Sequence, residues 1–393
     1  MYKHKEQVSS SLAVMPFERS IADEKPLVTI YPSYDVLFLG YIEYGFQILS
    51  RSGEIRLRFE SCKNAPVTYS PRERGFRGQM LFSVTHGAKD NIGLFDVSDG
   101  YSDLRTPLLH EVDVYYKMNY CPEYIAQVRK EIGPSRGIFA PATASFPVKY
   151  LDYLGFGRYL LSSWRRTVGF DENSNLRDDY LRWKVLVGRY RRLLRERLSV
   201  KKLLEMRCMP ETGFDVYYSA ACWTEDMDLV RQRAELIRAL RSLKGYKVRA
   251  EFVFNTKTAE IFPDLVAPYR RSVAEYYQTL AETRLAIIHK SLSGGAISWR
   301  LGESMALGKA YIHERTPNSL YMPHVLDPEY GVFDDADSLL SKIEAVLSSE
   351  ELRQQMKARS AALFDAYFAP DAAARYLIHG LLRRRHENRG ALE

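Results

Sequence analysis

Short apolar runs alternate with longer amphipathic segments along most of this 393-residue chain. The apolar runs that predict β-strands in the first half are residues 27–31, 79–85, 92–97 and 112–116. Strands of this kind that alternate with helices, such as the helix predicted at 36–49, are typical of a parallel sheet covered on both faces. Residues 1–26 indicate a loosely ordered start, and the Pro- and Gly-rich tract 121–156 indicates loops with short elements. Residues 160–202 predict helix.

The second half repeats the α/β pattern. Its predicted strands are residues 214–219, 248–254, 285–289 and 310–313, and its predicted helices are residues 225–243, 273–283, 298–307, 337–347, 350–366 and 371–383. The first of these helices has an acidic first turn and ends at Gly245, which are ordinary start and stop signals. The pattern predicts two doubly wound α/β units that split near residue 205, with closing helices that pass back to the first unit.

The segment 283–314 carries the clearest chemical signal. It predicts a strand, a glycine loop at 293–295, a short helix that stops at Gly308, and a second strand. Such a loop leaves backbone N–H groups at a helix N-terminus, where the helix dipole favours an anion. Arg300 and Glu303 are three residues apart and share a helix face. A cation and a carboxylate beside an anion-binding loop suit a ligand with phosphate and sugar hydroxyls, although a glycine loop beside a surface ion pair is the simpler alternative.

Composition limits the class of protein. The length favours two domains, and the chain is 46% hydrophobic and 27% charged, as expected for a soluble globular protein. No apolar run approaches the roughly 20 residues that span a bilayer, and the N-terminus does not resemble a signal peptide. The four cysteines are scattered and form no metal-binding motif, which favours a cytoplasmic protein without a metal.

The basic charge is concentrated in one amphipathic segment. The net charge is +7, and residues 182–202 combine many Lys and Arg residues with apolar residues at helical spacing. This segment predicts either a helix that touches an anionic membrane surface or, as we favour, a packed helix with a solvated basic face.

The order of motifs in the C-terminal half resembles the GT-B family of glycosyltransferases. The resemblance rests on Gly294-Gly295 followed by AISWRLGESMALGKAYI, on the acidic start of the helix after residue 334, and on the closing helices within 348–382. It implies an α/β fold of two Rossmann-like doubly wound domains that face each other across a cleft. The implied domains are residues 1–205 for the acceptor, residues 206–370 for a nucleotide-sugar donor, and residues 371–393 as a C-terminal helix that packs back on the N-terminal domain.

The resemblance also implies residue roles. Glu303 matches the carboxylate that binds the donor ribose, and Arg300 would neutralise phosphate charge. The residues expected to offer further donor contacts are Ser293, Gly294, Gly295 and Ala296 in the glycine loop, and Trp223 and Thr224 after the strand at 214–219. Many retaining members carry two glutamates separated by seven residues, but the position of the first glutamate is Gly295 here. We therefore expect an inverting, metal-independent transfer.

An inverting transfer needs a general base from the acceptor domain. Asp99 is the first candidate and Asp96 the second, because both follow the strand at 92–97 and would face the crevice at its carboxyl end. His86, in the turn after another strand, is the rival base. Lys117 sits near a strand end and could bind an anionic acceptor or a donor phosphate. Each has a plain alternative, namely turn chemistry for the aspartates and simple surface exposure for His86 and Lys117.

The function expected from these features is the transfer of a sugar from a nucleotide-sugar to a carbohydrate or glycolipid acceptor, as in bacterial surface polysaccharide synthesis, with no cofactor. The enzyme would be cytoplasmic, with peripheral contact to an anionic membrane as a further expectation. Nucleic acid or protein stays open as the acceptor, because the charge of +7 permits it. A non-catalytic nucleotide-sugar-binding protein of the same fold is the alternative from another class.

Overall fold

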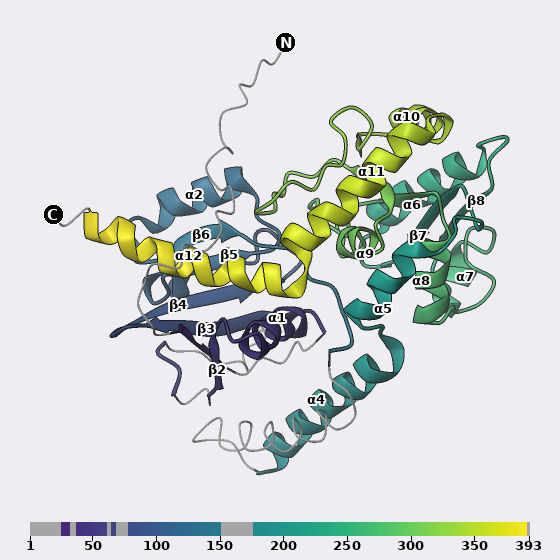
Figure 1. Ribbon diagram of the computed structural model, residues 1–393. Helices are drawn as coiled ribbons and strands as arrows, with labels where there is room; N and C mark the ends of the chain where they lie inside the picture. The colour runs from purple at the N-terminus through teal and green to yellow at the C-terminus, as the bar shows by residue number, and fades with distance from the viewer. Residues whose placement is uncertain (1–24, 32–36, 61–63, 68–77, 151–175, 391–393) are drawn as a thin grey trace.

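Two β-sheets organise the chain in the computed structural model, which describes residues 25–31, 37–60, 64–67, 78–150 and 176–390 (Figure 1). The first is a six-stranded sheet of order β2-β1-β3-β4-β5-β6, and the second is a five-stranded sheet of order β11-β10-β9-β7-β8. We call the first sheet with α1, α2 and α12 the N-terminal lobe, and the second sheet with α6 to α11 the C-terminal lobe. The fold is therefore mixed α/β with two Rossmann-like units, as predicted.

The N-terminal sheet is mixed rather than parallel. Its strands are β1 Leu27–Ile30, β2 Arg56–Phe59, β3 Gln79–His86, β4 Lys89–Asp96, β5 Val114–Lys117 and β6 Ile138–Pro141. β3 pairs antiparallel with both β1 and β4, whereas the other pairs are parallel. A two-residue turn with Gly87 at a positive φ of 67° joins β3 to β4, and a turn this short can connect only antiparallel strands. The expectation of a wholly parallel sheet in the first half was wrong for this reason.

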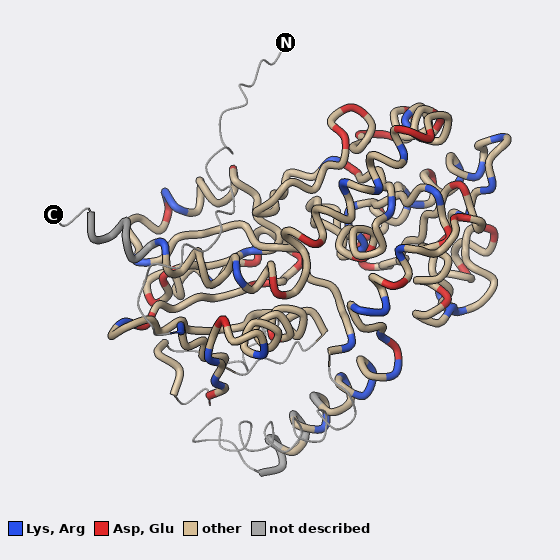
Figure 2. The backbone as a smooth tube through the Cα atoms, in the orientation of Figure 1, with Lys and Arg blue, Asp and Glu red and all other residues tan. Residues whose placement is uncertain are grey.

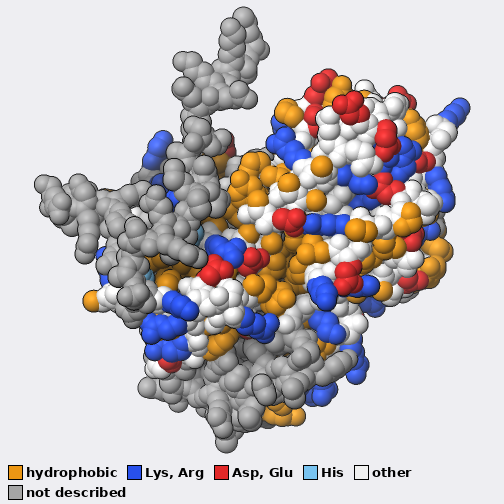
Figure 3. Space-filling model, viewed as in Figure 1, with side chains coloured by type: hydrophobic (Ala, Val, Ile, Leu, Met, Phe, Trp, Pro, Cys, Tyr) orange, Lys and Arg blue, Asp and Glu red, His pale blue; other side chains and the backbone are white. Residues whose placement is uncertain are grey.

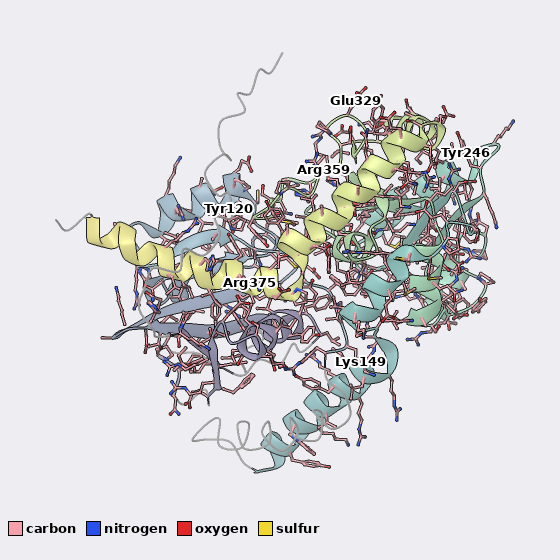
Figure 4. All side chains as sticks on the ribbon, viewed as in Figure 1. Tyr120, Lys149, Tyr246, Glu329, Arg359 and Arg375 are labelled. Carbon is pink, nitrogen blue, oxygen red and sulfur yellow. The ribbon has the colours of Figure 1, made fainter. Side chains whose placement is uncertain are left out.

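Helices from both ends of the chain cover the N-terminal sheet. They are α1 Leu39–Arg51, α2 Pro122–Ile132 and α12 Pro370–Gly390, with a short 3₁₀ turn η3 at Thr106–His110. α2 falls in the tract expected to be mostly loop. α12 lies against α1 so closely that a Cβ at Gly45 would be 1.9 Å from the Pro370 carbonyl oxygen. The Tyr116 hydroxyl donates to the Leu377 carbonyl at 2.8 Å, and Arg375, labelled on α12 in Figure 4, forms an ion pair with Glu54 at 2.8 Å.

The C-terminal sheet is entirely parallel. Its strands are β7 Val216–Ala220, β8 Val248–Phe252, β9 Leu285–Ile288, β10 Ala310–Glu314 and β11 Val332–Phe333. Its helices are α6 Met227–Arg241, α7 Thr256–Ile261, α8 Val273–Ala281, α9 Arg300–Ala306, α10 Ala336–Ser348 and α11 Glu350–Leu363, followed by a π-helical turn η5 at Phe364–Phe368. The strands and helices predicted here are confirmed to within a few residues, whereas α7 and β11 were not predicted. β8 and β9 lie on opposite sides of β7, and such a reversal of strand order is where open α/β sheets place ligands.

The basic segment between the lobes forms α4 Leu176–Glu196 and α5 Val200–Glu205, with the 3₁₀ turn η4 at Met206–Cys208. Residues 160–175, expected to begin this helical region, lie outside the described residues. α4 buries Val187, Tyr190 and Leu193, and its Lys and Arg positions follow one another along the helix in Figure 2. The apolar stripe is thus packed in part, because these three side chains are buried whereas Val185 is 55% exposed. None of the described helices is both long and apolar enough to cross a membrane.

The lobes contact each other directly. The Ile297 N–H donates to Asn119 Oδ1 at 2.8 Å, and the Ser319 N–H donates to the Tyr120 carbonyl at 2.7 Å. Phe146 packs on α9 where Gly302 leaves room, since a Cβ there would lie 2.6 Å from the ring. Figure 3 shows hydrophobic side chains gathered in a band between the two halves of the molecule. These contacts fix α9 and the loop before it against the N-terminal lobe.

Candidate functional site

A cavity of about 730 Å³ opens in the C-terminal lobe, near the carboxyl ends of β7 and β8. β7 contributes Tyr217 and Ser219, which are two residues apart and so face the same side of the sheet. The remaining walls come from the segment after β8, from α8, from α9 and from Arg197 in the connection between α4 and α5. The cavity therefore lies beside the reversal of strand order.

Local sequence signals fix the two helices that carry the polar groups. α8 begins with a capping box, in which the Glu275 N–H donates to Ser272 Oγ at 3.1 Å and the Ser272 N–H donates to Glu275 Oε2 at 2.7 Å. α9 is followed by Gly308 with φ +59°, which confirms the predicted stop. The helices that bring Tyr276, Arg300 and Glu303 to the cavity therefore have defined ends at these positions.

Glu303 borders the cavity from α9 and is only 2% exposed. Its Oε2 accepts a hydrogen bond from the Tyr276 hydroxyl and its Oε1 accepts one from the Tyr277 hydroxyl, both at 2.7 Å. Burial and then the charge of Glu303 raise the pKa of both tyrosines well above the ordinary value, so both hydroxyls remain protonated donors. The carboxylate is turned into the lobe, where it forms part of the cavity wall.

Arg300 brings positive charge to the same cavity. Its Nε is buried without a hydrogen-bond partner, and within the described part of the chain no ion pair uses its guanidinium. Burial lowers the pKa of Arg300, but Tyr276 and Glu303 outweigh that effect and raise it above the ordinary value. The guanidinium is therefore charged and keeps donors available for an anion.

Two more arginines line the cavity. Arg271 forms an ion pair with buried Glu251. Arg197 reaches the cavity from the connection between α4 and α5. Tyr269 also lines the cavity, and it is 54% exposed. Since the arginines outnumber the lining carboxylate Glu303, the cavity suits an anionic ligand that also carries hydroxyl groups.

The glycine loop between β9 and α9 is tied down on three sides. Ser293 donates to Asp226 through its N–H at 3.2 Å and its Oγ at 2.6 Å, and the Gly295 N–H donates to the Leu292 carbonyl at 2.9 Å. The Ile297 N–H donates to Asn119 Oδ1, as described above. Among the described residues, the N–H groups of Gly294 and Ala296 have no hydrogen bond, so these two remain available for a ligand.

The conformation of Gly295 explains why no glutamate stands there. Its φ is +77°, and a Cβ would lie 2.5 Å from Pro317 Cδ. A side chain at this position would be strained and would collide with Pro317. The Gly295 carbonyl also accepts two hydrogen bonds. Asn318 Nδ2 donates one at 2.7 Å, and the Thr316 hydroxyl donates the other.

A second, much smaller hollow lies beside the glycine loop, and its lining includes Ala296, His289, His313 and Glu314. His289 Nε2 is 3.3 Å from Glu314 Oε2. Burial lowers the pKa of His289 and of His313 to about 4, so both rings are neutral at neutral pH. Within the described residues, no three His, Cys, Asp or Glu side chains are grouped to hold a metal ion.

The predicted donor residues Ser293, Gly294, Gly295 and Ala296 of the glycine loop are not among the residues that line the cavity, and the same holds for the other two residues expected to contact the donor. Trp223 is 50% exposed, and Thr224 Oγ1 accepts a hydrogen bond from Lys257 Nζ at 2.7 Å. Neither side chain lines the cavity that holds Glu303 and Arg300.

Asp96 and Lys117 form a buried pair in the N-terminal lobe. Both side chains are fully buried, with Lys117 Nζ 3.2 Å from Asp96 Oδ1. The Tyr115 hydroxyl donates to Asp96 Oδ2 at 2.5 Å, and the Ser98 N–H donates to Asp96 Oδ1 at 2.8 Å. Asn119 Nδ2 donates to the Ser98 carbonyl at 3.2 Å, while its Oδ1 holds Ile297. Asn119 therefore links this network to the glycine loop.

The remaining candidates for a general base are separated. Asp99 is exposed just after β4, close in sequence to the buried pair. His86 pairs with Lys89 at one end of the β3–β4 hairpin, whereas Asp96 pairs with Gln79 at the other end. His86 and Asp96 therefore lie at opposite ends of this hairpin, because β3 and β4 run antiparallel.

Sequence reasoning missed several polar residues that shape the site, namely Asn119, Arg233, Tyr276 and Tyr277. Arg233 is 4% exposed and donates to the carbonyls of Ala221 at 2.7 Å and Lys290 at 2.8 Å, across the reversal of strand order. Its position between Leu229 and Ile237 on the buried stripe of α6 was the available signal, since an arginine on an apolar face must find acceptors.

Comparison with known families adds one match. Residues 231–379 match the model of a family described as "Glycosyl transferase-like". The match covers less than half of the chain and includes α8, the glycine loop and α9. A comparison with curated proteins found no match. The family match supports glycosyl transfer in general, with a sugar donor and an acceptor.

Proposed function

We propose, with the glycosyl transferase-like match as the premise, that this chain is a GT-B type glycosyltransferase whose C-terminal lobe binds a nucleotide-sugar. One observation carries the proposal. Inside the matched segment, a buried carboxylate at Glu303 and an unpaired guanidinium at Arg300 line the same cavity. An anion with a neighbouring diol, as in a nucleoside diphosphate, is the ligand that satisfies both groups.

The proposed roles follow the positions of these groups. Glu303 accepts the ribose hydroxyls, and Arg300 binds the diphosphate. The N–H groups of Gly294 and Ala296 take further phosphate oxygens, because they have no partner within the described residues. Tyr269, exposed on the cavity wall, offers an aromatic face to the base.

The proposed reaction is an inverting transfer without a metal. A base in the N-terminal lobe removes the acceptor hydroxyl proton while the acceptor oxygen attacks the anomeric carbon and the bond to the donor phosphate breaks. Arg300 stabilises the charge that develops on the leaving phosphate. We assign the base to Asp99, because Asp99 is exposed and can reach an acceptor, whereas the carboxylate of Asp96 is fully buried beside Lys117.

The test is thermal unfolding with UDP, GDP, ADP and CMP. Binding to the native state raises the unfolding midpoint, so one nucleotide class should give a clear shift. Glu303→Gln keeps the shape but weakens the acceptor, and we expect about 10- to 100-fold weaker binding. Glu344→Gln, on the exposed face of α10, is the matched control and should bind as the wild type does. If none of the four nucleotides shifts the midpoint, the proposal is wrong.

The acceptor is proposed to be a carbohydrate or glycolipid presented at a membrane surface on the cytoplasmic side. The support is the exposed basic face of α4, which includes Lys184, Arg191 and Arg195. Co-sedimentation with vesicles of phosphatidylglycerol and phosphatidylcholine tests it. Binding to the anionic vesicles that falls with salt, and falls again in Arg191→Glu/Arg195→Glu, supports the proposal. Equal binding to single-stranded DNA would point instead to a nucleic acid acceptor.

A further inference from the structure

Two consecutive tyrosines hold the carboxylate of Glu303. Tyr276 and Tyr277 follow the capped first turn of α8, and each donates its hydroxyl to a different oxygen of Glu303 at 2.7 Å. The Tyr277 ring is fully buried, while Tyr276 lines the cavity. Their ring centres are 5.2 Å apart at 62°, so the carboxylate lies against a preformed aromatic pair.

This arrangement limits how Glu303 can bind a ligand. A carboxylate oxygen has two acceptor directions, and a tyrosine hydroxyl fills one of them on each oxygen. Among the described residues no second donor is bonded to either oxygen, and Glu303 lines the cavity, so a ligand there can supply the missing donors. Burial makes it costly to leave either oxygen without one. One ligand hydroxyl can satisfy only one oxygen well, whereas two adjacent hydroxyls can satisfy both.

We propose that Tyr276 and Tyr277 are positioning residues that make Glu303 selective for a ligand with an intact vicinal diol. This inference rests on the proposed function, because it assumes that the cavity receives the ribose of a nucleotide. A plain structural role, in which the tyrosines only join α8 to α9, predicts a different result. Loss of a tyrosine hydroxyl would then weaken the binding of every ligand of the cavity to the same extent.

The experiment compares ribose with 2′-deoxyribose ligands. Binding of UDP, GDP and ADP and of their 2′-deoxy counterparts is measured by calorimetry for the wild type, Tyr276→Phe and Tyr277→Phe. We expect the wild type to prefer the ribose form of its nucleotide by about 10- to 100-fold, since a site built for a hydroxyl rejects the analogue that lacks it. In each variant the preference should fall to a few-fold, mostly through weaker binding of the ribose form.

Tyr116→Phe is the matched control. It removes a buried hydroxyl that donates to the Leu377 carbonyl in the N-terminal lobe, so its ribose preference should equal that of the wild type. If Tyr277→Phe misfolds, Tyr276→Phe tests the same idea at a position that lines the cavity.

The outcomes separate the two proposals. If the affinities for the ribose and deoxyribose forms fall equally in both variants, the tyrosines are only structural. A wild type that binds a nucleotide without ribose preference overturns this inference and leaves the nucleotide site standing. A wild type that binds none of the six ligands and does not bind CMP overturns the proposed function, and this inference falls with it.

Discussion

Two pairs of charged side chains, one in each lobe, are buried in different ways. In the N-terminal lobe, Asp96 and Lys117 are fully buried and are bonded to each other and to neighbouring residues. In the C-terminal lobe, the donors that Glu303 receives from the described residues are neutral hydroxyls, and Arg300 keeps a buried Nε without a partner beside an open cavity. The charges of the first pair are satisfied by protein groups, whereas the second pair keeps hydrogen-bond donors and acceptors that protein groups do not use.

This difference separates structural charge from functional charge. A buried pair whose members satisfy each other holds the fold, and breaking it leaves a charge without compensation. Charged groups that face a cavity with unused donors or acceptors gain their partners from a ligand. The comparison therefore predicts that changes to Asp96 and Lys117 affect stability and that changes to Arg300 and Glu303 affect binding.

The largest expected effect is acid destabilisation that begins in the C-terminal lobe. Unfolded histidine binds a proton near its ordinary pKa of 6.5, whereas His289 and His313 in the folded chain do so only near 4. Their contribution is complete above pH 6.5 and is lost as the pH falls toward 4. Each histidine should lower the free energy of unfolding by roughly 3 kcal/mol across that window. Urea unfolding at pH 7, 6, 5 and 4.5 measures the change.

Two glutamine variants sharpen this test. His289→Gln and His313→Gln each remove one of the groups, so each should flatten the dependence of stability on pH between 6.5 and 4. The double variant should flatten it further. A wild-type curve that stays level through this window would contradict the burial of neutral rings in this lobe.

The next effect is the cost of breaking the buried pair in the N-terminal lobe. Lys117→Met keeps the length of the side chain but leaves Asp96 as a buried carboxylate without its cation. We expect the free energy of unfolding to fall by about 3–5 kcal/mol. Chemical unfolding at pH 7 measures it, with the denaturant slope checked for a change in compactness.

The double variant Lys117→Met/Asp96→Asn tests why Lys117→Met loses stability. Removing the stranded charge should recover part of the stability, because an amide is cheaper to bury than a carboxylate. If Lys117→Met unfolded at the same denaturant concentration as the wild type, the pair would not be structural, and a ligand role for Lys117 would regain support.

The fold was predictable where one local signal decided it. β9 is a continuous apolar run, and α8 and α9 carry ordinary start or stop signals, so the positions of these elements followed from the sequence. The direction of β3 relative to β4 was not predicted, because it depends on a two-residue turn at Gly87 rather than on the apolar runs. α2 was hidden in a tract whose Pro and Gly residues suggested loops.

The site was predictable only in part. Spacing placed Arg300 and Glu303 on one short helix, and both line the cavity. The tyrosines that hold Glu303 come from α8, which is distant in sequence, so no local pattern could assign them. The burial of Lys117 was also invisible, because a lysine near a strand end is usually exposed and only the packing of Asp96 and Asp103 around it shows otherwise.

A smaller effect, on binding rather than folding, is expected from Arg300→Met. The methionine fills similar space without charge, so affinity for the nucleoside diphosphate that binds should fall about 10- to 100-fold, or roughly 1.4–2.8 kcal/mol. The free energy of unfolding should change by less than about 1 kcal/mol, since no ion pair within the described residues uses this guanidinium. Calorimetry and urea unfolding measure the two quantities.

The matching nucleoside without phosphates is the control ligand. Its affinity should be nearly the same in Arg300→Met and in the wild type, because Arg300 is assigned to the diphosphate. A variant that loses nucleoside and diphosphate binding equally would place Arg300 against the base or ribose instead.

The smallest expected effect is at the junction between the lobes. Asn119→Ala removes the hydrogen bond to the Ile297 N–H at 2.8 Å and the one to the Ser98 carbonyl at 3.2 Å. We expect a loss of about 1–2 kcal/mol in stability, because the Ile297 N–H stays buried without a partner. Asn91→Ala, which removes a buried bond within the N-terminal sheet, is the stability control. If the two lobes act together, Asn119→Ala should lower the turnover rate more than it changes donor affinity, because the glycine loop would shift relative to the acceptor lobe. Equal turnover in Asn119→Ala and Asn91→Ala would instead show that the hydrogen bond between Asn119 and Ile297 is not needed to position the glycine loop.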